Sequence, residues 1–182
     1  MTPAKWSVGH DGRVPQLVAP TERVHTSYLT AIADFHAEGR FTDIDIDELV
    51  DQSEFLAHVN ALIAQADPRT SRPDGYVPDT VLWWVDGTEF LGRLGIRHWL
   101  TESLARVGGH IGYSVAPAAR RRGHATAMLA AALPVTLALG IDPALVTCDV
   151  DNVASRRVIE RNGGQLDGCE DGTLRFWVPT HH

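Results

Sequence analysis

The stretch His110–Ala125, HIGYSVAPAARRRGHA, contains the residues that decide the fold. Ile111, Tyr113 and Val115 alternate with smaller residues, and this period of two is typical of a strand. Pro117 ends the strand because it has no N–H group to donate to a neighbouring strand. The first half of the stretch therefore predicts a strand followed by a turn.

A helix is expected directly after this turn. Apolar residues recur at helical spacing beyond Gly123, and three arginines stand just before that glycine. The first N–H groups of a helix have no partner within it, and the helix dipole is positive at that end. The sequence therefore predicts an anion site suited to a diphosphate. The arginines are Arg120, Arg121 and Arg122, and the apolar positions are Ala125, Met128, Leu129 and Ala132.

The composition is that of a chain with one hydrophobic core. Of the 182 residues 44% are hydrophobic, and we expect a lead-in over 1–13 followed by a single domain over 14–182. No apolar run reaches the roughly 18 residues of a membrane span, and 1–13 lack the apolar segment of a secretory signal. Cys148 and Cys169 have neither the number of a disulfide framework nor metal-ligand spacing. We expect a cytoplasmic protein with no metal and no membrane partner.

The charge is negative and unevenly distributed. The formal net charge of -7 disfavours nucleic-acid binding, which needs a basic face. The segment 34–54 is rich in Asp and Glu and has Arg40 as its one cation. Such a segment raises the local concentration of a cationic small molecule. The alternative is a solvated acidic face that maintains solubility.

The hydrophobic periods predict an α+β fold with a central mixed, mostly antiparallel sheet flanked by helices. The period changes from helical to alternating near Thr80, and Asp86–Gly87 predicts the turn of a hairpin. Pro134 predicts a kink or an early end of its helix. The expected strands are 14–18, 81–85, 88–96, 110–115, 144–149 and 174–178; the expected helices lie between Thr21 and Gly39, over 47–66, over 123–139, and after a cap at Asn152, with a helical turn or loop over 98–109.

Two motifs resemble those of the GNAT N-acetyltransferases. Arg120-x-x-Gly123-x-Ala125 after a strand is similar to the acyl-CoA signature of that superfamily. The later Asp151-Asn152-x-x-Ser155, followed by Asn162-Gly163-Gly164, resembles its next motif. The resemblance covers about 80–178, and the two N-terminal helices fit the same plan. It implies the acyl-CoA N-acyltransferase fold, with acetyl-CoA as co-substrate.

Shorter segments resemble a bacterial branch of the superfamily. They are Ile96-Arg97-His98, Gly108–Tyr113 and Thr147-Cys148-Asp149. Some relatives in that branch modify antibiotics, including aminoglycoside-like amines such as kasugamycin. The narrower match does not determine the acceptor.

The resemblance implies a position for acetyl-CoA between the strands 110–115 and 144–149. The pantetheine amides would pair with backbone groups of the first strand, as an added strand pairs with a free edge. The pyrophosphate would bind N–H groups at the helix start, where Gly123 permits close approach. No Gly-Lys-Ser/Thr follows, which disfavours a P-loop ATP site. The candidate cofactor residues are Tyr113, Ser114, Val115, Arg120, Arg121, Arg122, Gly123, His124, Ala125, Thr126, Asn152 and Ser155.

Direct attack of an amine on the thioester requires a base, an oxyanion donor and an acid for the thiolate. The expected oxyanion donor is a backbone N–H near Tyr113 or Val115. The tyrosine that serves as acid in many family members would fall at Ile159, so that acid is absent. Ser155 is a candidate contact for the CoA sulfur, or else an ordinary helix residue. The candidate bases are His110, His98, Asp149 and Glu89; the alternative for each histidine is a satisfied polar group.

Acceptor selection is expected from the N-terminal helices and the tryptophan strand. One of the two tryptophans should lie at a cleft or interface, because adjacent strand residues face opposite sides. The predicted function is acetyl transfer to a primary amine of a small cationic acceptor, such as an aminoglycoside or polyamine. The alternatives are a non-catalytic acyl-CoA-binding module and an enzyme for protein amines, and a homodimer is a reasonable expectation. The candidate acceptor residues are Trp83, Trp84, Asp43, Asp45 and Asp149.

Overall fold

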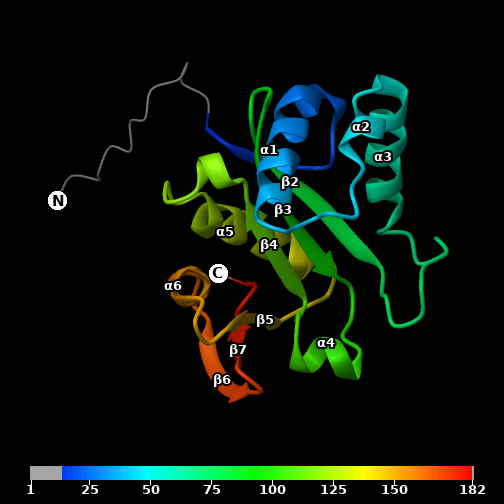
Figure 1. Ribbon diagram of the computed structural model, residues 1–182. Helices are drawn as coiled ribbons and strands as arrows, with labels where there is room; N and C mark the ends of the chain where they lie inside the picture. Colours follow the sequence, from blue (N-terminus) through cyan, green and yellow to red (C-terminus); the bar gives the residue numbers. More distant parts are fainter. Residues whose placement is uncertain (1–13, 182) are drawn as a thin grey trace.

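The strands form two antiparallel sheets that meet at one end. The computed structural model describes residues 14–181, so the predicted lead-in over 1–13 lies outside the described residues. The first sheet has the order β1-β2-β3-β4 and the second the order β5-β7-β6 (Figure 1). The strands are β1 Gln16–Val18, β2 Asp79–Asp86, β3 Glu89–Arg97, β4 Ile111–Val115, β5 Ala144–Asp149, β6 Gln165–Glu170 and β7 Thr173–Val178.

Helices cover both faces of the first sheet. On one face lie α1 and α3, and on the other lies α5 (Figure 1). The α+β class with antiparallel strands flanked by helices is thus confirmed. The helices are η1 Glu22–Val24, α1 His25–Ala37, α2 Ile46–Leu49, α3 Gln52–Ala64, α4 Glu102–Arg106, η2 Pro117–Ala119, α5 His124–Ala138 and α6 Val153–Arg161.

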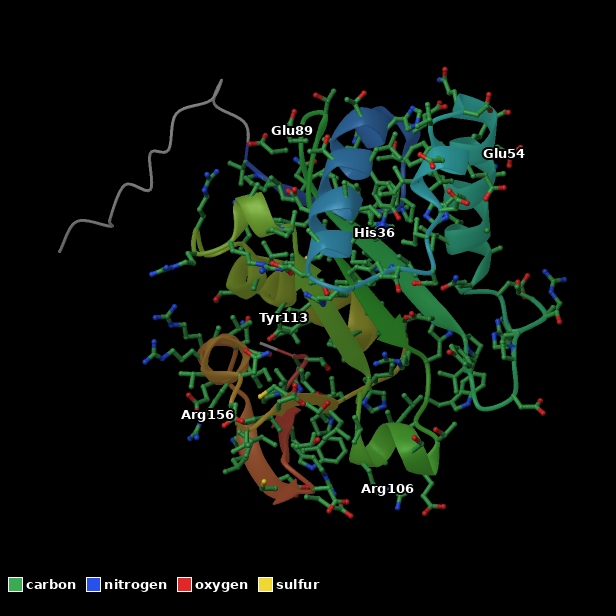
Figure 2. The ribbon with its side chains drawn as sticks, viewed as in Figure 1. His36, Glu54, Glu89, Arg106, Tyr113 and Arg156 are labelled. Atoms are coloured by element: carbon green, nitrogen blue, oxygen red, sulfur yellow. The ribbon has the colours of Figure 1, made fainter. Side chains whose placement is uncertain are left out.

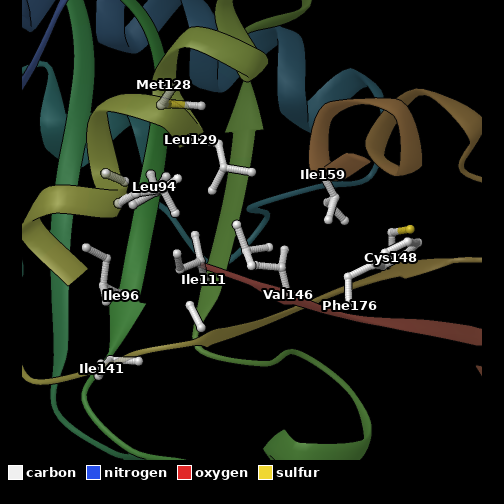
Figure 3. Close-up of a cluster of buried hydrophobic side chains, with 14 of the residues drawn as sticks. Leu94, Ile96, Ile111, Met128, Leu129, Ile141, Val146, Cys148, Ile159 and Phe176 are labelled. Atoms are coloured by element: carbon white, nitrogen blue, oxygen red, sulfur yellow. The ribbon is translucent and has the colours of Figure 1, made fainter. Parts of the chain in front are cut away.

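Each face of the first sheet buries its own hydrophobic cluster. Under α1 and α3, the rings of Tyr28 and Trp83 stack with centroids 4.8 Å apart. Under α5, Leu94 and Met128 pack in a second cluster that continues into the second sheet (Figure 3). Trp84 belongs to this second cluster. Both tryptophans are therefore core residues, and the expectation that one of them lies at a cleft was wrong.

Capping side chains set the helix boundaries in the N-terminal part. Asp51 accepts N–H groups of Ser53 and Glu54 and begins α3, while Asp45 accepts the N–H of Glu48 and begins α2. The single helix expected over 47–66 is consequently two helices.

Two details of the C-terminal half differ from the expectations. The helix α5 continues through Pro134 to Ala138, so it does not end early at the proline. The strand β6 was missed, since most of its residues are exposed and its polar sequence QLDGCE lacks a clear apolar period.

A short clasp joins the two sheets. His110 N donates to Leu145 O at 2.7 Å, and Leu145 N donates to His110 Nδ1 at 2.9 Å. Gly108 N donates to Thr147 Oγ1 at 3.0 Å just beside them. Beyond these hydrogen bonds, β4 and β5 do not pair with each other in the part of the chain that the structure describes. The two strands therefore diverge from the clasp.

Gly109 is the residue whose replacement should damage the clasp most. Its φ is +60°, and a Cβ built on it collides with the backbone carbonyl of Leu145. Gly109→Ala should lower the free energy of unfolding by about 2 kcal/mol or more, measured by urea denaturation. The control is Gly168→Ala, because a Cβ there meets no heavy atom within 4 Å. Equal stability of the two variants would contradict the clasp.

Candidate active site

A pocket of about 270 Å³ opens where β4 and β5 diverge. It lies between the two strands and the start of α6, and residues from the α4–β4 loop complete its wall. Figure 2 labels Tyr113 at the centre of this region. The lining residues are Arg97, Val107, Gly108, Ile111, Gly112, Tyr113, Thr147, Cys148, Asp149, Asn152, Ser155 and Thr173.

The edge of β4 that faces this pocket has free backbone groups. Arg97 N donates to His110 O, and Ala116 N donates to Leu91 O, at the two ends of the β3–β4 ladder. Because such groups alternate in an antiparallel pair, those of Tyr113 and Val115 point away from β3. The Nε group of Arg120 accordingly reaches Val115 O at 3.2 Å from the open side. The pantetheine amides of CoA fit this edge.

The pocket connects the two faces of the protein. Tyr113 and Cys148 belong to the cluster beneath α5 and α6. Gly112 and Thr147 face the opposite side, with Arg97 beside the first and Gly108 bonded to the second. Asp149 lies on the same side as Thr147, because residues two apart on a strand share a face. A donor on one face and an acceptor on the other would meet in this opening.

A hydrogen-bonded pair of hydroxyls lies on the α6 side. Tyr113 Oη and Ser155 Oγ are 2.8 Å apart, and Ser155 N donates to Asn152 Oδ1 at 3.0 Å. Burial raises the pKa of Tyr113 to about 12, against a smaller lowering by the Ser155 hydrogen bond. The phenol is therefore protonated throughout the physiological range. Ile159, where the family tyrosine would fall, is fully buried in the core.

Cys148 lines the pocket without the properties of a nucleophile. Burial, and secondarily the charge of Asp149, raises the pKa of its thiol. A protonated thiol attacks a thioester poorly. The arrangement favours direct attack by an acceptor amine over an acetyl-cysteine intermediate.

The start of α5 has the geometry of a phosphate site. Gly123 has φ of +84° and provides no side-chain cap, so the first N–H groups of the helix remain available. A Cβ at Gly123 would meet no heavy atom within 4 Å, and Arg121 and Arg122 are exposed beside it. The backbone of Ala125 and Thr126 belongs to the same first turn. The residues present therefore fit the diphosphate of CoA.

Two residues assigned to this phosphate site have other partners. Arg120 forms a two-pronged ion pair with Glu38, at 2.7 and 2.6 Å, so its guanidinium is already neutralised. His124 Nδ1 accepts the indole N–H of Trp84 at 3.2 Å, so its ring turns into the core. In this structure the side chains of Arg120 and His124 are therefore engaged elsewhere and do not point a free donor at the helix start, although the backbone of His124 still begins the helix.

The histidines expected as bases lie outside the pocket lining. His110 Nδ1 accepts the N–H of Leu145, so the neutral ring carries its proton on Nε2 and has no free basic nitrogen. His98 Nε2 is hydrogen-bonded to Thr80 Oγ1 at 2.8 Å. Glu89 is exposed at the β2–β3 turn, far from Tyr113 in Figure 2. The structure therefore brings none of these three residues into the pocket lining, and Asp149 is the one candidate base among the four that lines it.

The acceptor residues expected from the N-terminal half do not converge on the pocket. Trp83 and Trp84 are buried, and Asp45 caps α2. Asp43 is exposed and its charge acts on Tyr28 and His58. Ser114 Oγ faces α1, where it accepts a hydrogen bond from Arg40. Asp149 alone of the acceptor residues lines the opening.

Two functional side chains were missed. Arg97 Nη1 donates to Gly108 O at 2.9 Å and to Gly109 O at 3.0 Å, which holds the loop beside the pocket. The role of the Tyr113 hydroxyl did not follow from the motif, which concerns the backbone of this strand. A buried tyrosine needs a partner for its hydroxyl, and this requirement was the available signal.

The fold and the pocket together define an acyl-CoA-dependent acyltransferase. The family model described as "Acetyltransferase (GNAT) domain" matches residues 30–165, and the chain belongs to this family. No curated protein matches the chain closely enough to count as a relative. Within residues 14–181, none of the helices combines the length and apolar character that crossing a membrane requires.

Solved structures have the same fold at low sequence identity. The ribosomal L7/L12 alpha-N-protein acetyltransferase RimL, in complex with coenzyme A, is 20% identical, with a TM-score of 0.59 and coverage of 92% of this chain and 93% of that one. RimJ of Mycobacterium smegmatis, in complex with CoA-disulfide, is 22% identical, with a TM-score of 0.61 and coverage of 92% of this chain and 86% of that one. The microcin C7 self-immunity acetyltransferase MccE, in complex with acetyl-CoA and AMP, is 14% identical, with a TM-score of 0.61 and coverage of 93% of each chain.

The clasp makes stability depend on pH. Partial burial, and secondarily the charge of Arg97, lowers the pKa of His110 below its usual value near 6.5. The unfolded chain therefore binds this proton more readily, and stability present above pH 6.5 is lost as the pH falls toward the folded-state pKa. Asn at position 110 keeps a hydrogen-bond acceptor and does not titrate. His110→Asn should reduce the loss of unfolding free energy between pH 7 and pH 5.5, measured by denaturation at both values; an unchanged loss would contradict this role.

Proposed function

We propose that the protein transfers an acetyl group from acetyl-CoA to a primary amine in the opening between β4 and β5. As a member of the GNAT family it is an acetyltransferase that uses acetyl-CoA. The observation that carries the proposal is the pocket itself, with the Tyr113–Ser155 pair on one side and Asp149 on the other. The two sides supply the base and the hydrogen-bond donor that the reaction needs.

The donor is held by backbone groups and two cations. Tyr113 and Val115 offer the free edge of β4 to the pantetheine, and the first turn of α5 offers N–H groups to the diphosphate. Arg121 and Arg122 add positive charge there. Acetyl-CoA supplies the activated acyl carbon, and its carbonyl oxygen accepts a backbone N–H of β4 as negative charge develops.

Asp149 and the hydroxyl pair complete the chemistry. Asp149 orients the acceptor ammonium and takes a proton from it, directly or through water, so that the amine lone pair attacks the thioester carbon. The attack gives a tetrahedral intermediate whose nitrogen carries one surplus proton. When the carbon–sulfur bond breaks, its electron pair goes to sulfur, and the surplus proton leaves the nitrogen for water, so that the products are the amide and the CoA thiolate, which is protonated from solvent. The hydroxyl of Ser155 donates a hydrogen bond that stabilises the developing thiolate, while the Tyr113 hydroxyl donates a hydrogen bond to Ser155 and fixes its orientation. This pair takes the place of the tyrosine that is absent at position 159.

The acceptor class proposed is a primary amine. RimL is named for acetylation of a ribosomal protein N-terminus and MccE for self-immunity to microcin C7, so a protein terminus and an antibiotic are both open for this chain. The acidic segment gives less support to a polyamine or aminoglycoside than its charge suggested, because Asp45 and Asp51 are occupied as helix caps. A cytoplasmic location agrees with the two free cysteines. A homodimer is likewise a proposal.

A thiol-release assay with acetyl-CoA and a panel of primary amines tests the proposed function. Thiol release that depends on an added amine is expected, and mass spectrometry should find the acetylated product. The opposed outcome is saturable CoA binding without amine-dependent release, which would make the protein an acyl-CoA-binding module.

The hydroxyl pair gives a specific prediction for turnover. Tyr113→Phe should lower kcat by about tenfold with little change in the KM for acetyl-CoA, because an oriented hydrogen-bond donor is lost. Ser155→Ala should lower kcat at least as much. The matched control is Tyr76→Phe, which removes the hydroxyl of an exposed tyrosine. A kcat for Tyr113→Phe equal to that of the control would exclude the pair.

The phosphate site gives a prediction for donor binding. Arg121→Met and Arg122→Met should each raise the KM for acetyl-CoA by about tenfold, since a charge-assisted hydrogen bond to phosphate is lost. Arg106→Met removes an exposed cation on α4 and serves as the control. An equal rise of the KM for acetyl-CoA in Arg106→Met would show that the loss of net positive charge causes the effect, and it would contradict a phosphate site at Arg121 and Arg122.

A further inference from the structure

Two arginines lie together on the face of the first sheet that α1 covers. Arg40 follows α1, and its Nη2 group donates to Ser114 Oγ at 2.7 Å. Arg93 on β3 is the register partner of Ser114 on β4. Their guanidinium carbons lie 5.3 and 5.2 Å from the centre of the Phe41 ring. One serine and one aromatic ring therefore bring two positive charges together from separate elements.

Neither of these charges has a carboxylate partner in the described part of the chain. No Asp or Glu oxygen of residues 14–181 lies within 4 Å of either guanidinium. The neighbouring Arg120 is different, because Glu38 pairs with it at 2.6 Å. The charges of Asp43 and Arg93 have opposite effects on the pKa values of Tyr28 and His58, so both lie near that pair. Asp43 nevertheless forms no ion pair with Arg93. The hydrogen bond from Arg120 lowers the pKa of Glu38 most and the charge of Arg40 contributes, while the charge of Arg93 opposes the rise that burial causes in the pKa of Asp79. Neither carboxylate forms an ion pair with these two arginines, so Arg40 and Arg93 form a positively charged site without a directly paired carboxylate.

The aromatic platform of this site is held in an unfavourable backbone conformation. Phe41 has φ of +54°, a left-handed value that costs a bulky residue free energy. His36 donates to Phe41 O at 2.8 Å, and the ring meets Phe35 edge-on with centroids 4.9 Å apart. Such conformations persist where the surroundings impose them, and they concentrate at binding sites.

The arginine site is close to the opening between the strands. Ser114 lies two residues beyond Gly112, which lines the pocket, and residues two apart lie about 7 Å from each other along a strand. Gly112 and Ser114 share the face on which Asp149 also lies. Gly112 and Asp149 line the same pocket. An amine bound beside Asp149 could therefore carry a second group that extends past Gly112 toward the arginines.

We infer that Arg40 and Arg93 bind an anionic group, a carboxylate or a phosphate, that the acceptor amine carries. Planar guanidinium groups match the paired oxygens of such anions, and two of them converge here. The inference rests on the proposed function and specifies its acceptor as an amine with a nearby negative charge. A polyamine or aminoglycoside, which carries several positive charges, is repelled by the same pair.

The test compares amines that differ in one terminal group. Wild-type enzyme is given ω-amino carboxylates of three to seven carbons (about the reach set by a two-residue strand spacing), ω-aminoalkyl phosphates, alkylamines of equal length and the corresponding diamines. We expect kcat/KM for the best anionic amine to exceed that of its alkylamine by about tenfold or more, through a lower KM. The carboxylate and phosphate series distinguish the two anions. An equal or better diamine would overturn the inference while leaving the proposed function intact, whereas no release with any amine would count against both.

Substitutions of Arg40 and Arg93 test whether these two residues cause the preference for an anionic amine. Arg40→Met and Arg93→Met should each bring the ratio of kcat/KM between anionic amine and alkylamine toward one. The control Arg23→Met removes an exposed cation on η1 and should keep the wild-type ratio. Because the readout is a ratio within one protein, partial loss of folded enzyme does not alter it. A wild-type ratio in both arginine variants would place the anion elsewhere and overturn the assignment.

Discussion

The reciprocal hydrogen bonds between His110 and Leu145 are the constraint on which the site depends. They join the two sheets at one end, and Gly109 permits the close approach because any side chain there would meet Leu145. Beyond this clasp β4 has no strand partner on its outer edge within residues 14–181. On that edge the N–H groups of Tyr113 and Val115 face the opening, while Val115 O accepts Arg120 Nε. Backbone groups of a partly buried strand are usually paired, so the N–H groups left over are available to a ligand. The opening is thus a consequence of where the sheets are joined.

In the proposed reaction, the donor and the acceptor enter the opening from opposite faces of the sheets. The α5 and α6 side holds the helix start and the Tyr113–Ser155 pair, which suit the donor. The opposite side holds Asp149 and the unpaired arginines, which suit the acceptor. The Glu38–Arg120 ion pair fastens the end of α1 to the turn before α5. The segment that carries Arg40 is consequently held next to the proposed donor site.

Local features of the fold were predictable from the sequence, and long-range pairings were not. The strand–turn–helix at 110–125, the strand at 144–149 and the cap by Asn152 depend on near neighbours, and each was predicted. The partners of Arg120, His124 and Tyr113 lie 82, 40 and 42 residues away. No period or motif states which distant residue a polar side chain will meet. For that reason the arginine was assigned to phosphate, and the tyrosine hydroxyl was overlooked.

The most direct test of the account is amide hydrogen exchange of the protein with and without acetyl-CoA. If acetyl-CoA binds in the opening, the N–H groups of Tyr113 and Val115, and those at the start of α5, become protected from exchange when it is added. The N–H groups of Gly112 and Ser114 already face β3 and should change little. Protection confined to other elements, with Tyr113 and Val115 unaffected, would contradict the assignment of the opening between β4 and β5 as the donor site.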